Sequence, residues 1–387
     1  MEFTTYTLGE VCSRLSSGKS IKAAEIFPAG KYPVYGGNGL RGYADRSNFE
    51  GECAIIGRQG AYCGNVRYFK GEAYMTEHAV VCQANEKANT YYLSALLSTM
   101  HLERLSGQSA QPGLAVGTLS VQEINLPSLE AQRSIASILS SLDRKIELNN
   151  KINADLEEMA QAIFKNWFVD FEPFKDGKFV DSELGMIPEG WKVVTLDDLT
   201  SKFGTGLNPR KNFVLGHGNN YYVTIKNMGN NRIYLNDRCD KVDDEALAKI
   251  NKRSKLQKGD LLFSGIGTIG RVAMIVDDPI NWNTSESVFN MHPIDTVSSE
   301  FIYLLLLSDK FQQYVQQNAQ GGVQQGIRMA SLKAFQFAIP DDLNLFDNLV
   351  KPIISKVKSN DKENDALSLL RDTLLPRLMS GELEVPE

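Results

Sequence analysis

The sequence predicts an α+β fold: two similar mixed α/β domains separated by two long antiparallel helices that form a coiled-coil spacer, with a pseudo-twofold internal repeat. Three observations support this fold class. Residues 129–169 contain neither Gly nor Pro and repeat apolar residues at helical spacing. A second long segment with apolar residues at helical spacing covers residues 342–380, with Pro352 near its start. The residues before each segment resemble one another, which indicates a duplicated domain and not a solenoid.

Length and composition limit the class of protein. A chain of 387 residues has room for two or three domains. Its five cysteines form no CxxC pair and its four histidines lack metal-ligand spacing, so we expect free thiols, no metal and a cytoplasmic location. The N-terminus shows no signal peptide, and the longest apolar run, Phe301–Leu307, is too short to cross a membrane. The net charge is −6, with the acidic excess in the helical segments and the mixed domains neutral or faintly basic.

The first domain, residues 1–128, has short strands followed by a helix. Runs of β-branched and aromatic residues bounded by Gly and Asn predict strands at Glu52–Ile56, Asn65–Phe69 and His78–Cys82. A helix is predicted over Asn89–Arg104. A polar Gln/Gly-rich loop, Ser106–Gly117, follows it.

Residues 129–169 are predicted to form one long helix with a partner along one side. About 39 residues at ~1.5 Å each give a rod of roughly 58 Å, which suits a spacer. The alternative is a long surface helix on a globular core. An Asn in the apolar seam lowers stability but fixes the register. Two heptad series define the seam: Ile135, Leu142, Asn149, Leu156 and Ile163, and Ile138, Lys145, Ile152 and Met159.

Residues 170–191 are interrupted by Pro and Gly and are interpreted as a linker to the second domain, residues 192–341. The second long helix covers residues 342–380, and residues 381–387 form a tail. Because the helices are duplicated and joined in this order, we expect them to pair antiparallel. The second domain is predicted to contain strands, a helix and a loop at Tyr221–Ile225, Asp260–Phe263, Arg271–Val276, Ser299–Gln316 and Asn318–Gly326.

Five pairs of segments carry the repeat. They match in order along the chain, and insertions separate them. The pairs are Tyr6–Val11 with Val194–Leu199, Ala54–Val66 with Leu261–Val272, Thr76–Val80 with Thr284–Val288, Ser109–Gly113 with Asn318–Gly322, and Leu119–Pro127 with Leu332–Pro340.

The chemistry-bearing motifs favour a binding protein. Gly265–Gly270 satisfies G-x-G-x-x-G, but a strand and not a helix follows it, so we reject a dinucleotide site. There is no complete catalytic constellation. This absence points away from an enzyme and toward recognition of a partner.

Polar loop residues at matching places in the two domains are the candidate DNA contacts. Gln and Asn can pair with adenine and Arg with guanine in the major groove, and basic residues can contact phosphates. For any single residue an ordinary solvated loop is as good an interpretation, but the duplication favours function. The candidates are Tyr35, Asn38, Arg58, Gln59, Tyr62, Asn65, Gln108, Ser109, Gln111, Lys226, Arg232, Ser264, Thr268, Arg271, Gln320, Gln324 and Gln325.

The chain resembles the specificity subunits of type I restriction-modification enzymes. The resemblance extends over essentially the whole chain and is most specific in the long helices. The motifs that carry it are LDRKIELNNKIN at Leu142–Asn153, MAQAIFKNWFVDF at Met159–Phe171 and LRDTLLPRLMSGEL at Leu370–Leu383.

The resemblance implies that each mixed domain is a target recognition domain that reads one half of a bipartite, asymmetric site in double-stranded DNA. It implies two modification subunits, which methylate adenine N6, and restriction subunits, with no membrane partner. No cofactor is expected on this chain; S-adenosylmethionine, ATP and Mg are expected on the partner subunits. We assign helix pairing and subunit docking to Leu142, Ile146, Asn149, Ile152, Leu156, Met159, Ile163, Trp167, Leu367, Leu370 and Leu374.

Two other functions stay open on the sequence. The first is a non-catalytic protein-interaction scaffold with duplicated domains. The second is an intrinsic methyltransferase or nuclease, which the missing motifs oppose.

Overall fold

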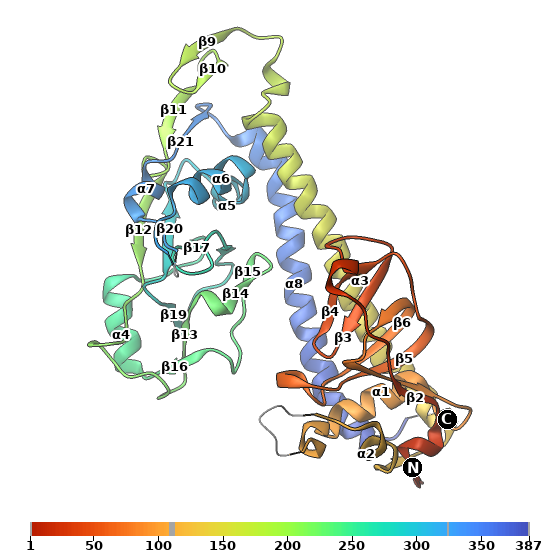
Figure 1. The fold of residues 1–387 in the computed structure, drawn as a ribbon. Coiled ribbons are helices and arrows are strands. Elements are labelled where there is room, and N and C mark those ends of the chain that lie inside the picture. Colours follow the sequence, from red (N-terminus) through yellow and green to blue (C-terminus); the bar gives the residue numbers. More distant parts are fainter. Residues whose placement is uncertain (1, 108–112, 323–324, 386–387) are drawn as a thin grey trace. The chain divides into compact units, whose positions relative to one another are not determined.

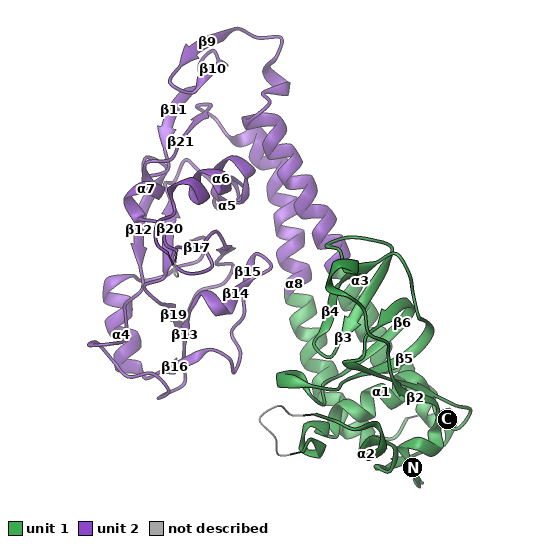
Figure 2. Cartoon of the chain, viewed as in Figure 1, with its two compact units in different colours: residues 1–149, 362–387 green, residues 150–361 purple. Residues whose placement is uncertain are grey.

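A computed structural model describes residues 2–107, 113–322 and 325–385. The chain divides into two compact units, which are shown in Figure 2. Unit 1 contains Met1–Asn149 and Lys362–Glu387, and unit 2 contains Asn150–Asp361. Two long helices, α3 (Leu129–Phe168) and α8 (Asn344–Met379), each contribute one half to unit 1 and the other half to unit 2 (Figure 1). The predicted long helices are therefore present, and each unit contains a pair of helical segments beside a mixed domain.

A six-stranded sheet forms the centre of unit 1. The strand order is β2-β7-β5-β6-β3-β4, and every neighbouring pair is antiparallel except β3 with β6. The strands are β2 (Cys12–Ser17), β7 (Ala79–Ala84), β5 (Phe49–Gly57), β6 (Val66–Met75), β3 (Tyr32–Gly36) and β4 (Gly39–Ala44).

A short strand pair and two helices complete unit 1. Strand β1 (Thr4–Thr7) pairs antiparallel with β8 (Glu123–Leu126), and β8 leads directly into α3. Helix α1 (Thr90–Thr99) begins where the Asn89 side chain accepts a hydrogen bond from the Tyr92 amide. A second helix, α2 (Val116–Ser120), precedes β8. Leu93, Ile135 and Leu378 are fully or almost fully buried in one core, so both long helices are packed into this domain.

Unit 2 divides its strands among smaller sheets. The largest has the order β12-β20-β17-β18, and a second has the order β16-β13-β19. These strands are β12 (Thr200–Thr205), β20 (Val288–Pro293), β17 (Leu261–Ser264), β18 (Val272–Met274), β16 (Asp240–Val242), β13 (Asn220–Val223) and β19 (Trp282–Thr284). The two-stranded pairs are β9 (Phe179–Ser182) with β10 (Gly185–Pro188), β11 (Lys192–Thr195) with β21 (Gln336–Ile339), and β14 (Met228–Gly229) with β15 (Arg232–Ile233).

Among the described residues of unit 2 there are four α-helices besides α3 and α8. They are α4 (Asp244–Arg253), α5 (Ser299–Leu307), α6 (Asp309–Asn318) and α7 (Met329–Lys333). The sequence predicted one helix over 299–316, whereas the structure has two. Ser308 separates them, because its extended backbone ends α5 and its side chain caps α6 through the Phe311 amide.

The internal repeat is confirmed at the level of strand order and register. The order β2-β7-β5-β6 in unit 1 corresponds to β12-β20-β17-β18 in unit 2. Both edge strands carry a bulge at the same place, between Cys12 and Arg14 and between Thr200 and Lys202. The Glu10 carboxylate accepts hydrogen bonds from the Thr7 amide and hydroxyl, and the Asp198 carboxylate accepts the same two from Thr195.

Two glycines occupy equivalent positions because the backbone packs closely there. A Cβ on Gly18 would lie 2.0 Å from the Met75 carbonyl oxygen, and one on Gly206 would lie 1.6 Å from that of Thr284. Real Cβ atoms do not approach so closely, so each position requires Gly. The glycines therefore hold residues 75–76 and 284–285 in matching positions in the two domains.

Polar side chains occupy the helix pair within each unit. In unit 1, the Asn149 amide donates to Asn364 Oδ1 at 3.0 Å and to Glu363 Oε2 at 2.8 Å. In unit 2, the Asn360 amide donates to Asn153 Oδ1 at 2.8 Å. These contacts pair α3 with α8 in antiparallel order in each unit, as expected for Asn residues that fix a register.

The predicted linker, residues 170–191, contains the β9–β10 hairpin and an aromatic anchor. The ring centroids of Phe171 and Phe174 lie 5.3 Å and 5.0 Å from that of Trp191. Trp191 in turn packs on Phe168 at the end of α3, at 5.6 Å. The aromatic contacts give this segment, predicted as a linker, a fixed structure.

None of the described helices combines the length and the apolar composition needed to span a membrane.

Candidate nucleic-acid interface

Four segments meet at one edge of the sheet in unit 1. They are the β3–β4 turn, the Gly-rich loop 57–65, the β6–β7 turn 75–79 and the segment that starts at Gly113. The Arg58 amide donates to the His78 carbonyl oxygen at 2.9 Å, and the Leu114 amide donates to that of Arg58 at 2.8 Å. The Arg67 guanidinium reaches the Asn38 carbonyl oxygen at 3.5 Å. Residues far apart in sequence are thus collected on one loop edge, which we call the loop edge of unit 1.

Exposed polar, aromatic and basic side chains cover this loop edge. Tyr62 is 49% exposed, and Asn38, Gln59 and Asn65 are also exposed. Arg58 is half-buried, and its guanidinium contacts the Glu77 carbonyl oxygen at 3.5 Å. Rings and amides of this kind can stack on or hydrogen-bond to bases.

Tyr35 belongs to the sheet beside the loop edge. Its ring packs on Phe69 with centroids 5.1 Å apart, and burial raises the pKa of its hydroxyl. Of the predicted contacts in unit 1, it is the one whose ring has a structural role.

The equivalent loop edge of unit 2 is built from the Gly-rich loop 264–271, the β19–β20 turn and residues 325–327. The Gly265 amide donates to the Ser287 carbonyl oxygen and the Ile327 amide to that of Gly265, both at 2.9 Å. Thr268, Gln320 and Gln325 are exposed here. Unit 2 therefore repeats the backbone contacts of unit 1 with different side chains.

Three predicted contacts in unit 2 need correction. Ser264 is fully buried and its hydroxyl accepts a hydrogen bond from the Arg271 amide at 2.8 Å, so it cannot reach a base. The Arg271 guanidinium donates to the carbonyl oxygens of Ile225 and Met228 at 2.8 Å and 2.6 Å. Arg232 pairs with Asp361 of α8 at 3.5 Å. Arg271 and Arg232 are thus internal contacts of unit 2, which their charge alone did not reveal.

The other candidates divide simply. Lys226 is exposed in the short helical turn 225–227. Gln108, Ser109, Gln111 and Gln324 lie outside the described residues. The repeat aligned Gly113 with Gly322 by sequence, but the structure makes Gly326 its equivalent. Gly113 forms a β-bridge with Gln59, and Gly326 forms one with Ile266, which occupies the same position in unit 2.

The structure adds residues that the sequence analysis did not select. Arg41 and Arg67 are exposed beside the β3–β4 turn, and Leu40 at the start of β4 is 52% exposed. On unit 2, Arg328 is exposed directly after Ile327. A signal was available for Arg41, since it lies three residues after Asn38 in the sequence.

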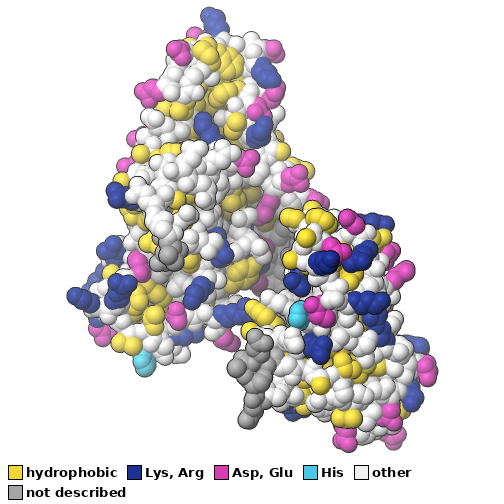
Figure 3. Space-filling model, viewed as in Figure 1, with side chains coloured by type: hydrophobic (Ala, Val, Ile, Leu, Met, Phe, Trp, Pro, Cys, Tyr) yellow, Lys and Arg dark blue, Asp and Glu magenta, His cyan; other side chains and the backbone are white. Residues whose placement is uncertain are grey.

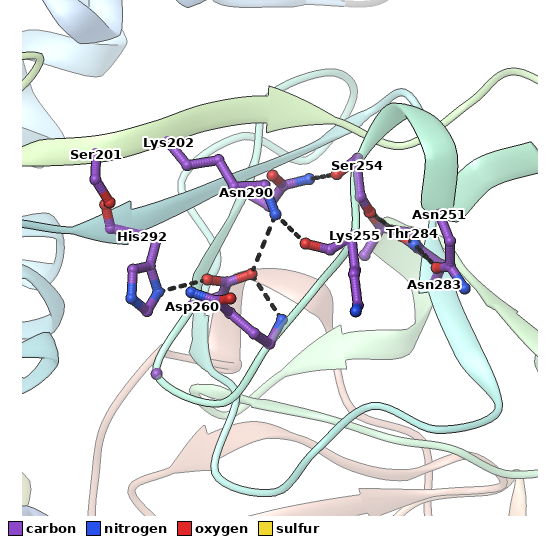
Figure 4. A network of polar contacts seen from close by, with 12 residues as sticks. Ser201, Lys202, Asn251, Ser254, Lys255, Asp260, Asn283, Thr284, Asn290 and His292 are labelled. Carbon is purple, nitrogen blue, oxygen red and sulfur yellow. Dashed lines mark hydrogen bonds and ion pairs between the residues drawn. The ribbon is translucent and has the colours of Figure 1, made fainter.

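A further basic surface of unit 2 surrounds α4. Figure 3 shows Lys and Arg side chains gathered near this helix, whose last turn carries Lys252 and Arg253. The buried network in Figure 4 anchors its end. The Asn283 amide donates to the Asn251 side chain at 2.7 Å and to the Ser254 carbonyl oxygen at 2.8 Å, and Asn290 donates to the Ser254 hydroxyl. These hydrogen bonds fix the end of α4, which carries the basic residues.

One further polar contact extends the network of Figure 4. Asp260, almost fully buried, contacts His292 Nδ1 at 2.8 Å. Burial raises the pKa of this carboxyl, although the nearby Lys202 acts in the opposite direction.

The helix residues predicted for pairing and docking differ in how deeply they are buried. Asn149 is buried between the helices, Ile163 and Trp167 pack on the core of unit 2, and Leu374 packs on that of unit 1. The half-buried members are Leu142, Ile146, Ile152, Leu156 and Leu367.

Met159 and Leu370 do not take part in helix pairing. Met159 is 51% exposed and Leu370 is 47% exposed. The side chains buried instead include Asn153, Ala160 and Phe164. A straight helix has 3.6 residues per turn, so its buried stripe drifts away from a strict seven-residue repeat.

A groove of about 280 Å³ lies beside the helices in unit 1. Tyr91 donates a hydrogen bond to the Asp143 carboxylate, which also pairs with Arg371 at 2.8 Å. Burial raises the pKa of Tyr91, so its hydroxyl stays a donor. These polar contacts link the mixed domain of unit 1 to both long helices.

The chain is similar to one family of known proteins. The family model described as "Type I restriction modification DNA specificity domain" matches twice, at residues 1–158 and 188–345. The MjaIX specificity subunit of Methanocaldococcus jannaschii is 30% identical over 305 residues, 77% of this chain and 69% of that protein. The EcoprrI specificity subunit of Escherichia coli is 43% identical over 141 residues, 35% of this chain and 35% of that protein.

A solved structure with this fold is an S subunit from M. genitalium. The crystal structure of the type I restriction-modification S subunit from M. genitalium has a TM-score of 0.61 and 17% sequence identity. The match covers 98% of this chain and 96% of that one. At this identity the likeness concerns the fold alone.

Proposed function

This chain belongs to the family of type I restriction-modification DNA specificity subunits, and we propose that its two domains read the two halves of one bipartite, asymmetric site in double-stranded DNA. Members of this family select a DNA sequence and are themselves not catalytic. Residues 1–128 contact one half-site and residues 192–341 contact the other.

The observation that carries the proposal is the duplicated loop edge. Both domains hold a Gly-rich loop against the same turn by the same backbone hydrogen bond, at 2.9 Å in each. The side chains on these loops differ between the domains. A fixed frame with variable side chains suits two readers of different base sequences, which supports an asymmetric site.

The partners follow from the same proposal. Two modification subunits dock on the long helices, where Met159 and Leu370 expose apolar side chains, and they hold S-adenosylmethionine for methylation of adenine N6. Restriction subunits use ATP and Mg. The target adenine leaves the duplex to enter a modification subunit. This chain contributes the DNA contacts and the surface on which the partners assemble.

A domain exchange tests the proposal. Residues 1–128 are replaced by the corresponding domain of a relative with another target, and the methylated sequence is read across a genome. We expect one half-site to change and the other to stay. The matched exchange of residues 192–341 should change the other half. A change in both halves from one exchange would contradict the proposal, and a chain without sequence preference in gel shifts would favour an interaction scaffold.

A further inference from the structure

Two glutamates occupy the same position in the two domains. The Thr76 amide donates to the Tyr35 carbonyl oxygen at 2.9 Å, and the Ser285 amide donates to that of Val223 at 2.8 Å. Thr76 and Ser285 are therefore equivalent residues.

The residues that follow Thr76 and Ser285 are also equivalent. The Ala79 amide donates to the Thr76 carbonyl oxygen at 3.0 Å, and the Val288 amide donates to that of Ser285 at 3.2 Å. Each turn thus contains two residues between the equivalent ends. Glu77 and Glu286 are the first of these two.

Both glutamates lie on the loop edges that carry the proposed function. Each turn is tied to its Gly-rich loop through the residue after the glutamate, His78 in unit 1 and Ser287 in unit 2. Each turn is also held from behind by the close approach of Gly18 or Gly206. The two carboxylates therefore have a fixed backbone beneath them.

The Glu77 carboxylate has an unused acceptor. Its Oε2 atom is buried and has no hydrogen-bond partner among the described residues, while Oε1 lies 3.5 Å from His78 Nε2. The side chain as a whole is 38% exposed. Oε2 is not accessible to a partner, so Oε1, which carries a second acceptor position, is the oxygen that can accept a hydrogen bond from a bound base.

The Glu286 carboxylate is held in place by its own domain. Its oxygens accept hydrogen bonds from the Asn208 amide at 2.5 Å and the Tyr222 hydroxyl at 3.3 Å. Burial raises the pKa of Tyr222, so its hydroxyl remains a donor. Glu286 is only half-buried, and each carboxylate oxygen has a second acceptor position.

The phosphates of DNA repel a carboxylate. A hydrogen bond from a base to the carboxylate offsets that repulsion. In the major groove the donors are the exocyclic amino groups of cytosine and adenine, and Glu accepts from cytosine N4. Resting on the proposed function, we propose that Glu77 and Glu286 are specificity-determining residues. Each accepts a hydrogen bond from a cytosine N4 amino group, Glu77 in one half-site and Glu286 in the other.

The test selects targets from random-sequence DNA with the full-length chain in complex with its modification subunits. Glu77→Gln replaces one of the two carboxylate oxygens by an NH2 group, which donates instead of accepting, and removes the negative charge. The preference for cytosine should then fall at one position of one half-site by about 5- to 150-fold, which corresponds to ~1–3 kcal/mol. Glu286→Gln should relax one position in the other half-site only.

Two further variants separate base reading from other roles. Glu77→Asp keeps the charge but withdraws the carboxylate by one methylene, so the same position should relax. Retained preference in Glu77→Asp would show a purely electrostatic role and overturn the inference. The control is Glu52→Gln on β5, where Glu52 pairs with Lys70 at 2.7 Å, and it should select the unaltered target.

Failure of the inference and failure of the proposed function give different results. A wild-type complex that selects no target would refute the function itself. A wild type with a clear target, whose Glu77→Gln and Glu286→Gln variants select that same target, would refute only the inference. Loss of the whole half-site would indicate that the domain has unfolded and would also count against base reading, because a single contact governs a single position.

Discussion

Replacing Asn153 with Leu tests whether buried amides fix the pairing of α3 with α8 in unit 2. Asn153 is 8% exposed. Its amide group donates to the Val357 carbonyl oxygen at 3.3 Å and to Asp361 Oδ1 at 3.0 Å. Its carbonyl accepts from the Asn360 amide at 2.8 Å. Leu has the same number and branching of side-chain heavy atoms as Asn, so the substitution removes the hydrogen bonds without opening a cavity.

The expected magnitude follows from what the substitution leaves behind. Asn360 is 1% exposed, and its Oδ1 has no hydrogen-bond partner among the described residues. In Asn153→Leu the Asn360 amide loses its acceptor as well. A buried unsatisfied polar group costs about 1–3 kcal/mol, so the free energy of unfolding should fall by ~2–3 kcal/mol.

The double variant Asn153→Leu, Asn360→Leu should recover most of that loss. Replacing both partners by apolar groups is nearly neutral, and we expect unfolding within ~1 kcal/mol of the wild type. The double variant is then more stable than Asn153→Leu alone, so the two losses are not additive. Register would be less strictly specified, because an apolar seam accepts more than one alignment.

Tryptophan fluorescence during urea unfolding measures this effect in unit 2. The three tryptophans, Trp167, Trp191 and Trp282, all belong to unit 2. A loss of 2 kcal/mol shifts the midpoint by roughly 1 M urea. The control is Asn166→Leu, an exposed position on α3, where the shift should be within ~0.5 kcal/mol. Additive losses in the double variant would refute the reasoning.

Two other predictions use the same measurement. Burial raises the pKa of Glu157 above its ordinary value, so the folded chain keeps a proton that the unfolded chain has already released. The free energy of unfolding should therefore fall as the pH rises from the pKa of this carboxyl in the unfolded chain to its raised pKa in the folded chain. Glu157→Gln should flatten that slope, whereas Glu158→Gln, exposed on the same helix, should not. Gly206→Ala should destabilise unit 2 by ~1–3 kcal/mol, because the new Cβ meets the Thr284 carbonyl at 1.6 Å. Gly322→Ala, in open space, is its control, and an equal loss there would contradict the close-approach argument.

The sequence predicted the elements with the strongest patterns. The long helices and the strands around residues 52–56 and 261–263 have uninterrupted periodicity, so local preference and tertiary structure agree. Helix α4 and the β9–β10 hairpin were not predicted. The hairpin contains Pro and Gly, which are typical of loops. The aromatic contacts of Phe171 and Phe174 with Trp191 stabilise the segment that contains it.

The charged candidates also depend on tertiary contacts that the local sequence does not show. Sequence identifies Arg232 and Arg271 as possible DNA contacts because both are cationic and near polar loops. Their actual partners, a carboxylate of α8 and two backbone carbonyls, come from distant parts of the chain. A guanidinium that already satisfies buried acceptors cannot leave them without cost. Exposure, which only the fold determines, separates these residues from Arg41 and Arg67.

The alignment of the repeat by sequence placed Thr76 opposite Thr284, which put Glu77 opposite a serine. The hydrogen bonds at the turn shift this alignment by one residue and bring Glu77 opposite Glu286. A one-residue shift in so short a segment changes sequence similarity little, yet it changes which side chain a domain presents at a given place. Equivalent backbone atoms, and not equivalent letters, identify the positions at which two duplicated readers can differ or agree in the base they select.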